Sequence, residues 1–599
     1  MRFREVLRFE LASQFRRVTI WVTFVALLAF ACMITLAADP ADGEVMRNSP
    51  FGIVFVSVLA GVVWLLIGGS VAGEAAARDM HSGMHPLVYT LPLRKGEYLG
   101  GRLVAACLVN ALILLAIPAG VMIATALAGI GATPLASFDP AAYLSAFGVV
   151  TLPFAIVVTA VQFAWALSRR SAMASYAASV AIFVVSHAGL FAILRLAGRE
   201  DLLTELDLVG IGGILFAIGE RLTPAEQNTR LIALDPALLL NRALWLGIAL
   251  AVSMLAWRRF RFAHPSAARR RRMIPWLRRR RGASSAHLAA GETRPIAVPD
   301  ATRAFGAGTR ARQALALALA SFRTATGGRF GLALGGLFAL HLIVLLPEYM
   351  RFMGVPLRPD TGHVLSMFTA PLTEARTPLV VIPLLIAYFA GEIHWRERDT
   401  GIDEMADALP LPDAVRFLGR LLGLGLAIAA WLTLLGSAAI LGQLAMGHAE
   451  LRLPLYFGVL FGLQLPEYLL FAVLALAIHA AADHKYLGHV LAIAALGAIG
   501  FAPALGVRHH LLVYSASPGW SWSDMRGFGP GLGPWIWFKV YWAGWALLLG
   551  VGATLVLARG REGRVTSRFG RARITAAARR VALAAVALIV AAGGVVFYN

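Results

Sequence analysis

The sequence predicts an all-α polytopic membrane protein with two parallel six-helix transmembrane repeats and one extra C-terminal span. Of its 599 residues, 59% are hydrophobic and 15% are charged, and the mean hydropathy is +0.72. A soluble globule could not hide so much apolar surface. Arg residues gather in short polar segments beside the apolar runs, so the net charge of +21 indicates positive-inside topology. The basic runs lack the interleaved aromatic residues of a nucleic-acid surface, and we expect no nucleic-acid partner.

An internal duplication is the second observation behind this fold class. The stretch 72–102, AGEAAARDMHSGMHPLVYTLPLRKGEYLGGR, returns at 390–420 as AGEIHWRERDTGIDEMADALPLPDAVRFLGR. Six residues match at one constant offset: Gly83, Leu91, Pro92, Leu93, Gly101 and Arg102 correspond to Gly401, Leu409, Pro410, Leu411, Gly419 and Arg420. Each copy lies between two apolar runs, so we expect a loop at a membrane face with one short helix before Leu-Pro-Leu.

The first transmembrane half is predicted to cover residues 1–260. We expect a helix in the membrane interface at 1–17 and spans at 18–38, 51–72, 103–130, 141–167, 171–194 and 241–257. The apolar piece 208–218 is too short to cross the bilayer and is predicted to be re-entrant or interfacial. Residues 261–310 carry two tetra-Arg blocks, which predicts a cytosolic linker attracted to anionic lipids by about 1 kcal/mol per basic residue.

The second half, residues 311–558, repeats this plan. An interfacial helix is expected at 311–324, and spans at 330–346, 378–390, 421–446, 455–481, 487–506 and 535–557. Residues 559–599 add a basic segment and a thirteenth span at 581–597. Because each half has an even number of spans, both have the same orientation and the pathway is expected between them. The N-terminus is predicted to be cytosolic and the C-terminus periplasmic.

No signature of catalysis was found in the sequence. There is no G-x-x-x-x-G-K-[ST] phosphate loop and no H-E-x-x-H zinc motif. Both cysteines, Cys32 and Cys107, fall inside predicted spans, which excludes a disulfide framework. We therefore expect no catalytic, cofactor-binding or metal site, and ATP hydrolysis only in a separate partner.

Charged residues in the repeated loops are the main candidate site. Glu74 and Arg78, like Glu392 and Arg396, stand four positions apart and can meet on one helical face. Such a pair could also be a helix-end ion pair that only determines topology. However, both loops are richer in charge than a turn requires, and we predict that they bind a cytosolic partner. The predicted coupling residues are Glu74, Arg78, Asp79, Arg94, Lys95, Glu97, Glu392, Arg396, Glu397, Arg398, Asp399, Asp403, Glu404 and Asp407.

Ionisable residues inside predicted spans form a second candidate set. These are His187, His341, Glu467 and His479. Intramembrane ionisable residues often mark substrate pathways. The alternative is a polar side chain buried against a neighbouring helix.

Four phrases resemble the type 2 ABC-transporter permeases, and among them a subgroup of large bacterial permeases. The phrases are GEIHWRERD (391–399), DALPLP (407–412), NRALW (241–245) and SDMRGFG (523–529). The resemblance covers nearly the whole chain. It implies an ABC permease subunit in the bacterial inner membrane, whose loop between the second and third spans carries a coupling helix that docks on a separate ATPase. Two such loops imply two ATPase copies.

Some members of that subgroup continue into an outer zinc aminopeptidase domain. The terminal GGVVFYN (593–599) resembles the junction into it, but the sequence stops there, and no peptidase activity follows from the resemblance. The alternative function is therefore a membrane anchor or scaffold for a periplasmic zinc aminopeptidase. The transported substrate is not identified by the sequence.

Overall fold

The computed structural model describes residues 2–37, 45–128, 136–172, 174–262, 304–326, 329–352, 355–374, 381–503, 506–523, 525–557, 567–568, 570 and 574–598. Within these ranges the chain is mostly helical, with one short antiparallel hairpin of two residues per strand, β1 (Arg351–Phe352) and β2 (Val355–Pro356). Ten helices of the described part are long and apolar enough to cross a membrane. The predicted all-α, multi-pass membrane fold is confirmed at this level.

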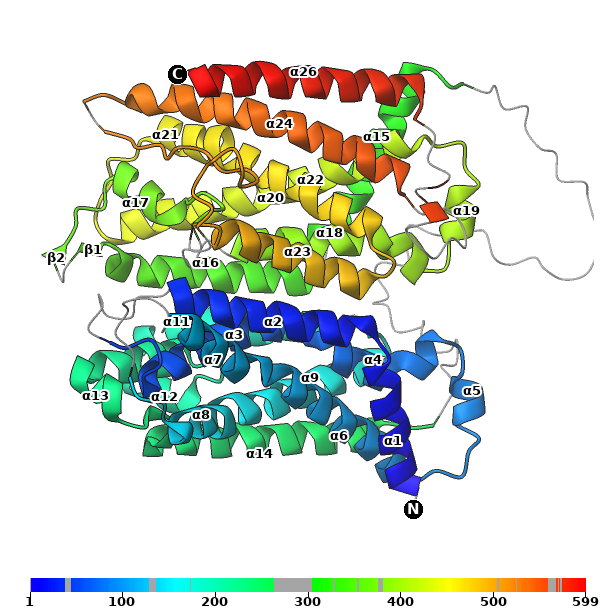
Figure 1. Ribbon diagram of the computed structural model, residues 1–599, viewed down its shortest axis with the longest axis vertical. Coiled ribbons are helices and arrows are strands. Elements are labelled where there is room, and N and C mark those ends of the chain that lie inside the picture. Colours follow the sequence, from blue (N-terminus) through cyan, green and yellow to red (C-terminus); the bar gives the residue numbers. More distant parts are fainter. Residues whose placement is uncertain are drawn as a thin grey trace, which may run out of the picture.

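The first half of the chain forms one helical bundle, the lower one in Figure 1. Its long helices are α1 (Arg2–Phe15), α2 (Val18–Ala37), α3 (Pro50–Ile67), α4 (Gly69–His81), α6 (Lys95–Leu114), α7 (Ala116–Ala128), α9 (Leu152–Arg169), α10 (Ala174–Phe183) and α14 (Pro236–Arg259). Shorter elements are α5 (His85–Val88), α8 (Pro140–Ser145), η2 (Ala146–Thr151), η3 (Val184–Leu190), α11 (Phe191–Leu196), η4 (Glu200–Leu202), α12 (Leu203–Leu206), η5 (Ile211–Ile218), η6 (Gly219–Arg221), α13 (Pro224–Thr229) and η7 (Ile232–Leu234). Trp64, Ile113 and Val158 belong to its buried apolar core.

The second half forms the other bundle, the upper one in Figure 1. Its elements are α15 (Ala307–Thr326), α16 (Arg329–Tyr349), α17 (Thr361–Phe368), α18 (Val381–Asp399), α19 (Asp403–Asp407), α20 (Asp413–Ala445), α21 (Leu453–Phe457), η10 (Gly458–Gln464), α22 (Leu465–Ala481), α23 (Lys485–Gly500), η11 (Gly529–Gly531), α24 (Leu532–Leu555) and α26 (Ala576–Tyr598). A separate core contains Leu432 and Phe471. Helix α26 packs along α24, where Gly544 allows the close approach of Ile589.

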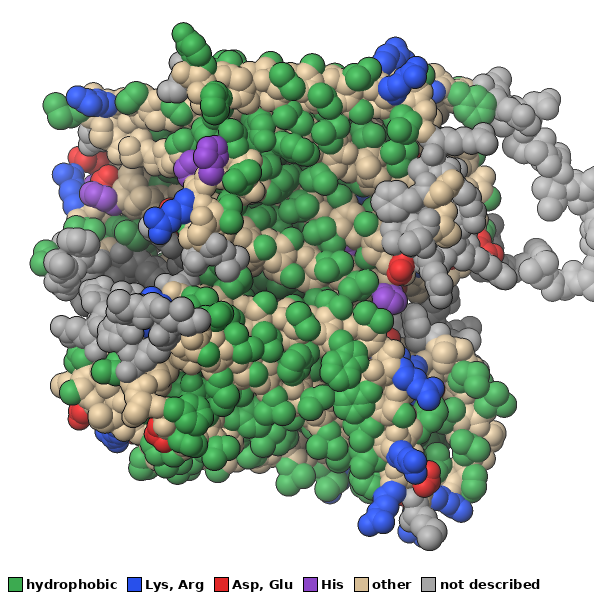
Figure 2. Space-filling model, viewed as in Figure 1, with side chains coloured by type: hydrophobic (Ala, Val, Ile, Leu, Met, Phe, Trp, Pro, Cys, Tyr) green, Lys and Arg blue, Asp and Glu red, His purple; other side chains and the backbone are tan. Residues whose placement is uncertain are grey.

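The two ends of the molecule differ from its middle. Helices α5 and α19 lie at one end, which we call the loop end, and α13, α17 and the β1–β2 hairpin lie at the opposite end (Figure 1). Figure 2 shows hydrophobic side chains over the middle of the visible face and charged side chains gathered towards the ends. This distribution fits a hydrocarbon layer across the middle.

All six predicted spans of the first half, three of the second half and the C-terminal span match one of the ten candidate helices. The other three predictions, at 330–346, 378–390 and 487–506, fall on α16, α18 and α23, which are not among those ten. Helix α23 has only 16 residues, and α18 ends in the polar sequence HWRERD. The total of thirteen spans therefore stays a prediction.

The duplicated stretch is a loop over only part of its length, which corrects the prediction. Helix α3 continues past Gly68 into α4, which ends at His81, and α18 continues to Asp399. The charged residues at the start of each copy therefore lie on helices. Each loop contains one short helix, as predicted, and each begins with a glycine in the left-handed region, Gly83 at φ 70° and Gly401 at φ 68°. Glycine adopts this conformation without strain, so the same turn ends both helices.

The apolar segment 208–218 lies inside the first bundle. Its residues 211–218 form η5, and the Asp207 carboxylate accepts hydrogen bonds from the amides of Gly212 at 2.8 Å and Gly213 at 3.0 Å. These bonds satisfy backbone donors at the start of the segment, so that it can be buried without crossing the bilayer.

Candidate functional site

Helix α5 is held against the first bundle by aromatic contacts. Tyr89, just after α5, meets Phe262 edge-on at 5.3 Å between ring centroids and Phe260 at 6.0 Å. Tyr98 of α6 stacks on Phe260 at 5.9 Å. Burial raises the pKa of the Tyr89 hydroxyl. The last residues after α14 thus form an apolar support for α5.

Helix α19 is held by charge. Arg416 of α20 is 4% exposed, and its Nη1 lies 2.6 Å from the carboxylate of Asp407 while its Nη2 donates to the Ala406 carbonyl at 3.1 Å. Arg398 of α18 lies 3.9 Å from Asp403. The two short helices occupy equivalent places in the two halves, and α5 is therefore supported by aromatic rings whereas α19 is supported by ion pairs.

Both short helices and the residues that flank them expose large apolar side chains. In the first copy the exposed fractions are 48% for Met84, 65% for Leu87 and 53% for Leu91. In the second copy they are 49% for Ile402, 74% for Met405 and 61% for Leu409. The positions correspond one by one, at a shift of 318 (84 to 402, 87 to 405 and 91 to 409). We call these two sets the apolar triplets. Recurrent exposed apolar groups of this kind are typical of interaction surfaces.

The first three predicted coupling residues face inward. Arg102 of α6 donates to Asp79 at 2.7 Å, and Tyr98 donates to the same carboxylate at 2.8 Å. Arg78 contacts Glu10 at 2.5 Å and Ser13 at 2.8 Å on α1. Asp79 is only 6% exposed, so it serves packing between α4 and α6, and a partner that docks at the loop end would not reach it.

The predicted pairs at four-residue spacing are replaced by longer-range pairs. Glu74 lies 3.1 Å from Arg17, which follows α1. In the second copy, Glu392 lies 3.0 Å from Lys485 of α23, and Arg396 donates to Thr324 of α15. Each residue therefore links its helix to another element.

The second copy repeats the links of the first. Arg420 of α20 lies 2.9 Å from Glu397 of α18, at the positions equivalent to Arg102 and Asp79. Asp399 lies 2.6 Å from Lys485. In each half an arginine near the end of α4 or α18 also donates a hydrogen bond to a hydroxyl group, that of Ser13 on α1 or Thr324 on α15.

The remaining predicted coupling residues lie closer to the apolar triplets. Arg94 is exposed, and its amide donates to Glu97 at 2.9 Å. Lys95 donates to the carbonyl of Trp257 at 3.0 Å. Glu404 of α19 is exposed beside Met405. Arg94 and Glu404 form part of the surface that a partner at the loop end would meet.

The candidate intramembrane residues contact neighbouring helices. His341 of α16 is fully buried, and Phe191 of α11 meets its ring edge-on at 6.3 Å between centroids. His479 of α22 accepts a hydrogen bond from the Trp395 indole at 3.2 Å. The side chain of His187 lies outside the described part. These contacts fit burial against another helix, and a substrate role stays a prediction.

Glu467 is held by a partner that the sequence reasoning missed. Lys539 of α24 forms an ion pair with Glu467 and donates to the Ser515 carbonyl at 2.6 Å. Both side chains are at least 93% buried. Lys539 is also an ionisable residue inside a predicted span, 535–557. It therefore meets the criterion by which Glu467 was selected as a candidate.

At the loop end the two bundles meet through aromatic and polar side chains. Tyr176 of α10 stacks on Tyr486 of α23, with centroids 5.9 Å apart, and lies 5.6 Å from His489. The ring of Tyr388 of α18 stacks on His489 at 5.7 Å.

No family model matches the chain, and no curated protein matches it.

Proposed function

We propose that this chain is the membrane-spanning permease subunit of an ATP-binding cassette transporter of the bacterial inner membrane. It would form the translocation pathway and couple to a separate ATPase subunit. The apolar triplets, of which Leu87 lies on α5 and Met405 on α19 while the other members flank these helices, are the observation that carries this proposal. They are exposed at equivalent positions of both halves, at one end of the molecule.

Two equivalent surfaces on one chain suit a partner with two equivalent copies. A separate ATPase acting as a pair would bring one apolar groove to each short helix. Helix-in-groove docking uses apolar anchors at helical spacing, and successive members of each triplet are three and four positions apart. The exposed charges of Arg94 and Glu404 would then lie at the rim, where they affect mainly the association rate.

The tandem organisation supports the same proposal. We propose that each half is one interfacial helix followed by six spans, in the same orientation, with residues 1–260 and 311–558 as the two halves and 261–310 as the linker. The equivalent pairs Arg102–Asp79 and Arg420–Glu397 are what such a duplication would leave.

Coupling requires a rigid contact between the docking surface and the spans. Helix α5 is bracketed by α4 and α6, and the Asp79–Arg102 pair joins these two helices. Helix α19 is bracketed by α18 and α20, which Glu397–Arg420 joins. A displacement of either short helix would therefore be transmitted to two spans at once.

The alternative, a membrane anchor or scaffold for a periplasmic zinc aminopeptidase, has less support. An anchor for an enzyme on the outer side needs no exposed apolar surface at the loop end. The matched triplets are unexplained in that case.

The test is co-purification with a defined partner. The reading frames beside this gene would be searched for a phosphate-loop ATPase, whose absence would weaken the proposal. The full-length chain would be co-expressed with such an ATPase, and the ATPase retained on the tagged chain would be measured. Leu87→Glu and Met405→Glu should each reduce retention and the double variant should abolish it. Leu512→Glu is the matched control, because Leu512 is 74% exposed but lies outside both loops. Full retention by the double variant would refute docking at the triplets.

A further inference from the structure

Two helices of the second half form a socket for one side chain of the first half. Tyr176 of α10 is 3% exposed and stacks on Tyr486 of α23 at 5.9 Å between ring centroids. His489 of α23 lies 5.6 Å from the same ring, and Tyr388 of α18 lies 6.5 Å from it. We call Tyr388, Tyr486 and His489 the ring socket. At the loop end, the two halves therefore meet through these rings.

The ring socket is fixed by close packing inside the second half. Tyr388 stacks on His489 at 5.7 Å, and His479 of α22 meets His489 edge-on at 4.9 Å. Gly391 of α18 leaves room for the imidazoles, because a Cβ atom there would lie 2.7 Å from Nε2 of His489 and 2.7 Å from Cε1 of His479. Such close packing transmits displacement, so the socket moves together with α18 and α23.

On the other side, Tyr176 is joined to the helix that precedes α5. Its neighbour Ser175 donates a hydrogen bond to the Gly69 carbonyl at 2.6 Å. A Cβ atom at Gly73 would lie 2.5 Å from the Ser175 hydroxyl oxygen, so α10 packs directly on α4. Helix α4 ends at His81, shortly before α5. A displacement of α5 would therefore reach Tyr176 through α4.

The ring socket has a similar connection to α19. Helix α18 carries Tyr388 and ends at Asp399, about three helical turns later, and α19 begins at Asp403. Asp399 lies 2.6 Å from Lys485, the residue before Tyr486 on α23. A displacement of α19 would therefore reach both helices of the socket.

Farther from the loop end, the halves stay in contact along α23. Phe501, just after this helix, meets Phe30 of α2 edge-on at 5.4 Å. A Cβ atom at Gly497 would lie 3.9 Å from the Phe30 ring. Figure 1 shows α23 beside α2 along the boundary between the two bundles. Position 497 is thus a point on this boundary, two turns of α23 beyond His489.

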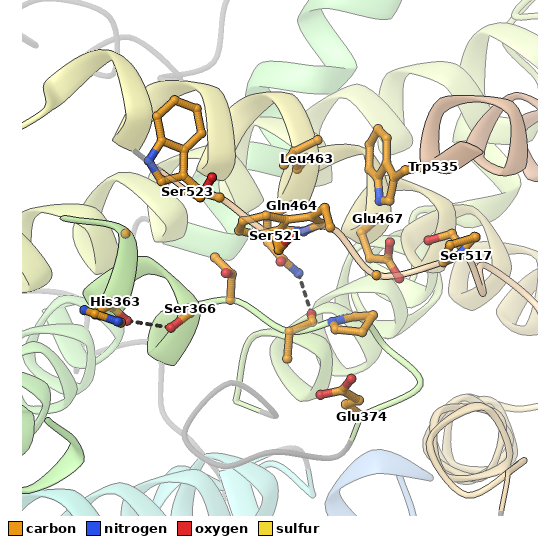
Figure 3. A pocket seen from close by; sticks show the side chains of 18 of the residues that line it. His363, Ser366, Glu374, Leu463, Gln464, Glu467, Ser517, Ser521, Ser523 and Trp535 are labelled. Carbon is orange, nitrogen blue, oxygen red and sulfur yellow. Dashed lines mark hydrogen bonds between the residues drawn. The ribbon is translucent and has the colours of Figure 1, made fainter. Parts of the chain in front are cut away.

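A cavity of about 470 Å³ lies elsewhere, at the end opposite the loops. The residues that line it all belong to the second half. Figure 3 shows its walls, where Gln464 donates to the Ala370 carbonyl at 3.1 Å. This cavity is therefore separate from the boundary between the halves, which would open only if the ring contacts of α23 with the first half separated.

From these contacts we infer that Tyr176 and the ring socket form a gate at the loop end of the pathway, and that displacement of α5 and α19 controls it. The inference rests on the proposed function for the pathway and for the partner. Ring pairs are modest contacts that can separate at small cost, while buried ion pairs within each half, such as Asp79–Arg102, stay intact.

The experiment measures thiol labelling from the loop end. Gly497→Cys would be introduced into the full-length chain together with Cys32→Ser and Cys107→Ser, and membrane vesicles would be treated with a membrane-impermeant maleimide. Leu87→Cys shows that the loop end faces the reagent, because Leu87 is 65% exposed. Gly497→Cys should label slowly, and adding Tyr176→Ala should raise its labelling rate by roughly tenfold or more, because the open arrangement becomes more populated.

Three further variants separate a gate from a general loss of packing. Tyr176→Phe keeps the ring and should leave labelling slow, whereas Tyr486→Ala should accelerate it from the other side of the contact. Tyr143→Ala is the matched control, because Tyr143 is a tyrosine of the first half that is 4% exposed and lies outside the ring socket. It should leave the rate unchanged. Equal labelling with and without the Tyr176 and Tyr486 rings, or equal acceleration by Tyr143→Ala, would overturn the inference.

The ATPase partner provides a separate readout. Trapping the docked ATPase with ATP and vanadate should change the labelling rate of Gly497→Cys by about tenfold, since the trapped state shifts the gate. A retained ATPase with unchanged labelling would overturn control of the gate by docking. Failure to retain any ATPase, with labelling still dependent on the rings, would count against the proposed function alone.

Discussion

Arg102 donates a hydrogen bond from Nη2 to Oδ2 of Asp79 at 2.7 Å and so joins α6 to the end of α4. The guanidinium also lies 4.4 Å from the ring centroid of Tyr98 and 3.9 Å from the Glu10 carboxylate of α1. Three helices therefore converge on one buried cation. Such a group stabilises a fold only while its negative partners are present.

We expect Asp79→Asn to destabilise the protein by about 3 kcal/mol, because the buried Arg102 would lose its nearest charge. Thermal unfolding of the purified chain should show a lower midpoint. Glu397→Gln is the matched variant in the second half, where the Glu397 side chain is 26% exposed. The Glu397→Gln variant should lose less free energy of unfolding, on the order of 1 kcal/mol or less. An equal effect of both variants would contradict this ranking.

Arg416→Ala should loosen α19 without changing the apolar triplet itself. The substitution removes charge-assisted hydrogen bonds to Asp407 and Ala406, which are worth about 1.5–3 kcal/mol for a charged group. Amide exchange in residues 403–408 should accelerate roughly tenfold or more. Hydrogen–deuterium exchange would measure this, with α5 as the internal control, because its aromatic support is untouched. Unchanged exchange in α19 would show that Arg416 does not hold it.

The Glu467–Lys539 pair should show strong coupling in a double-mutant cycle. Glu467→Gln or Lys539→Met alone leaves a buried charge unpaired and should cost about 3–5 kcal/mol. The double variant should be less destabilised than the sum of the two losses. Thermal unfolding of all four proteins gives the coupling energy. Simple additivity would mean that the two groups do not interact in the membrane.

Reporter fusions would test the predicted topology. Fusions after residues 39, 281 and 599, which lie outside the described part of the chain, should report the outer side, the cytosol and the outer side. The expectation follows from the Arg bias beside alternate loops. Thirteen spans require this pattern, whereas a cytosolic reading after residue 599 would remove the thirteenth.

The sequence by itself determined the all-α, multi-pass membrane class, the ten helices that are long and apolar enough to cross a membrane, and the duplicated stretch. These features are local, because the length of an apolar run and the identity of matched residues can be read without knowing what they contact. The short helix in each loop was predictable for the same reason, as Gly83 and Gly401 precede it and Leu-Pro-Leu follows it. The apolar triplets occupy equivalent positions at a shift of 318, with an apolar residue in both copies, but the prediction of the docking site from the sequence depended on the charged residues.

Only the tertiary structure decided which charged residues are exposed. Asp79 and Glu404 look equivalent as acidic residues of the same duplicated stretch, yet Asp79 is buried by α6 and Glu404 is exposed on α19. The partner of Asp79 is 23 positions away, and Lys539 is 72 positions from Glu467. Helix packing brings these residues together, and no local pattern encodes it. Since burial sets the strength of a charge interaction, the choice between a docking residue and a packing residue depended on the fold.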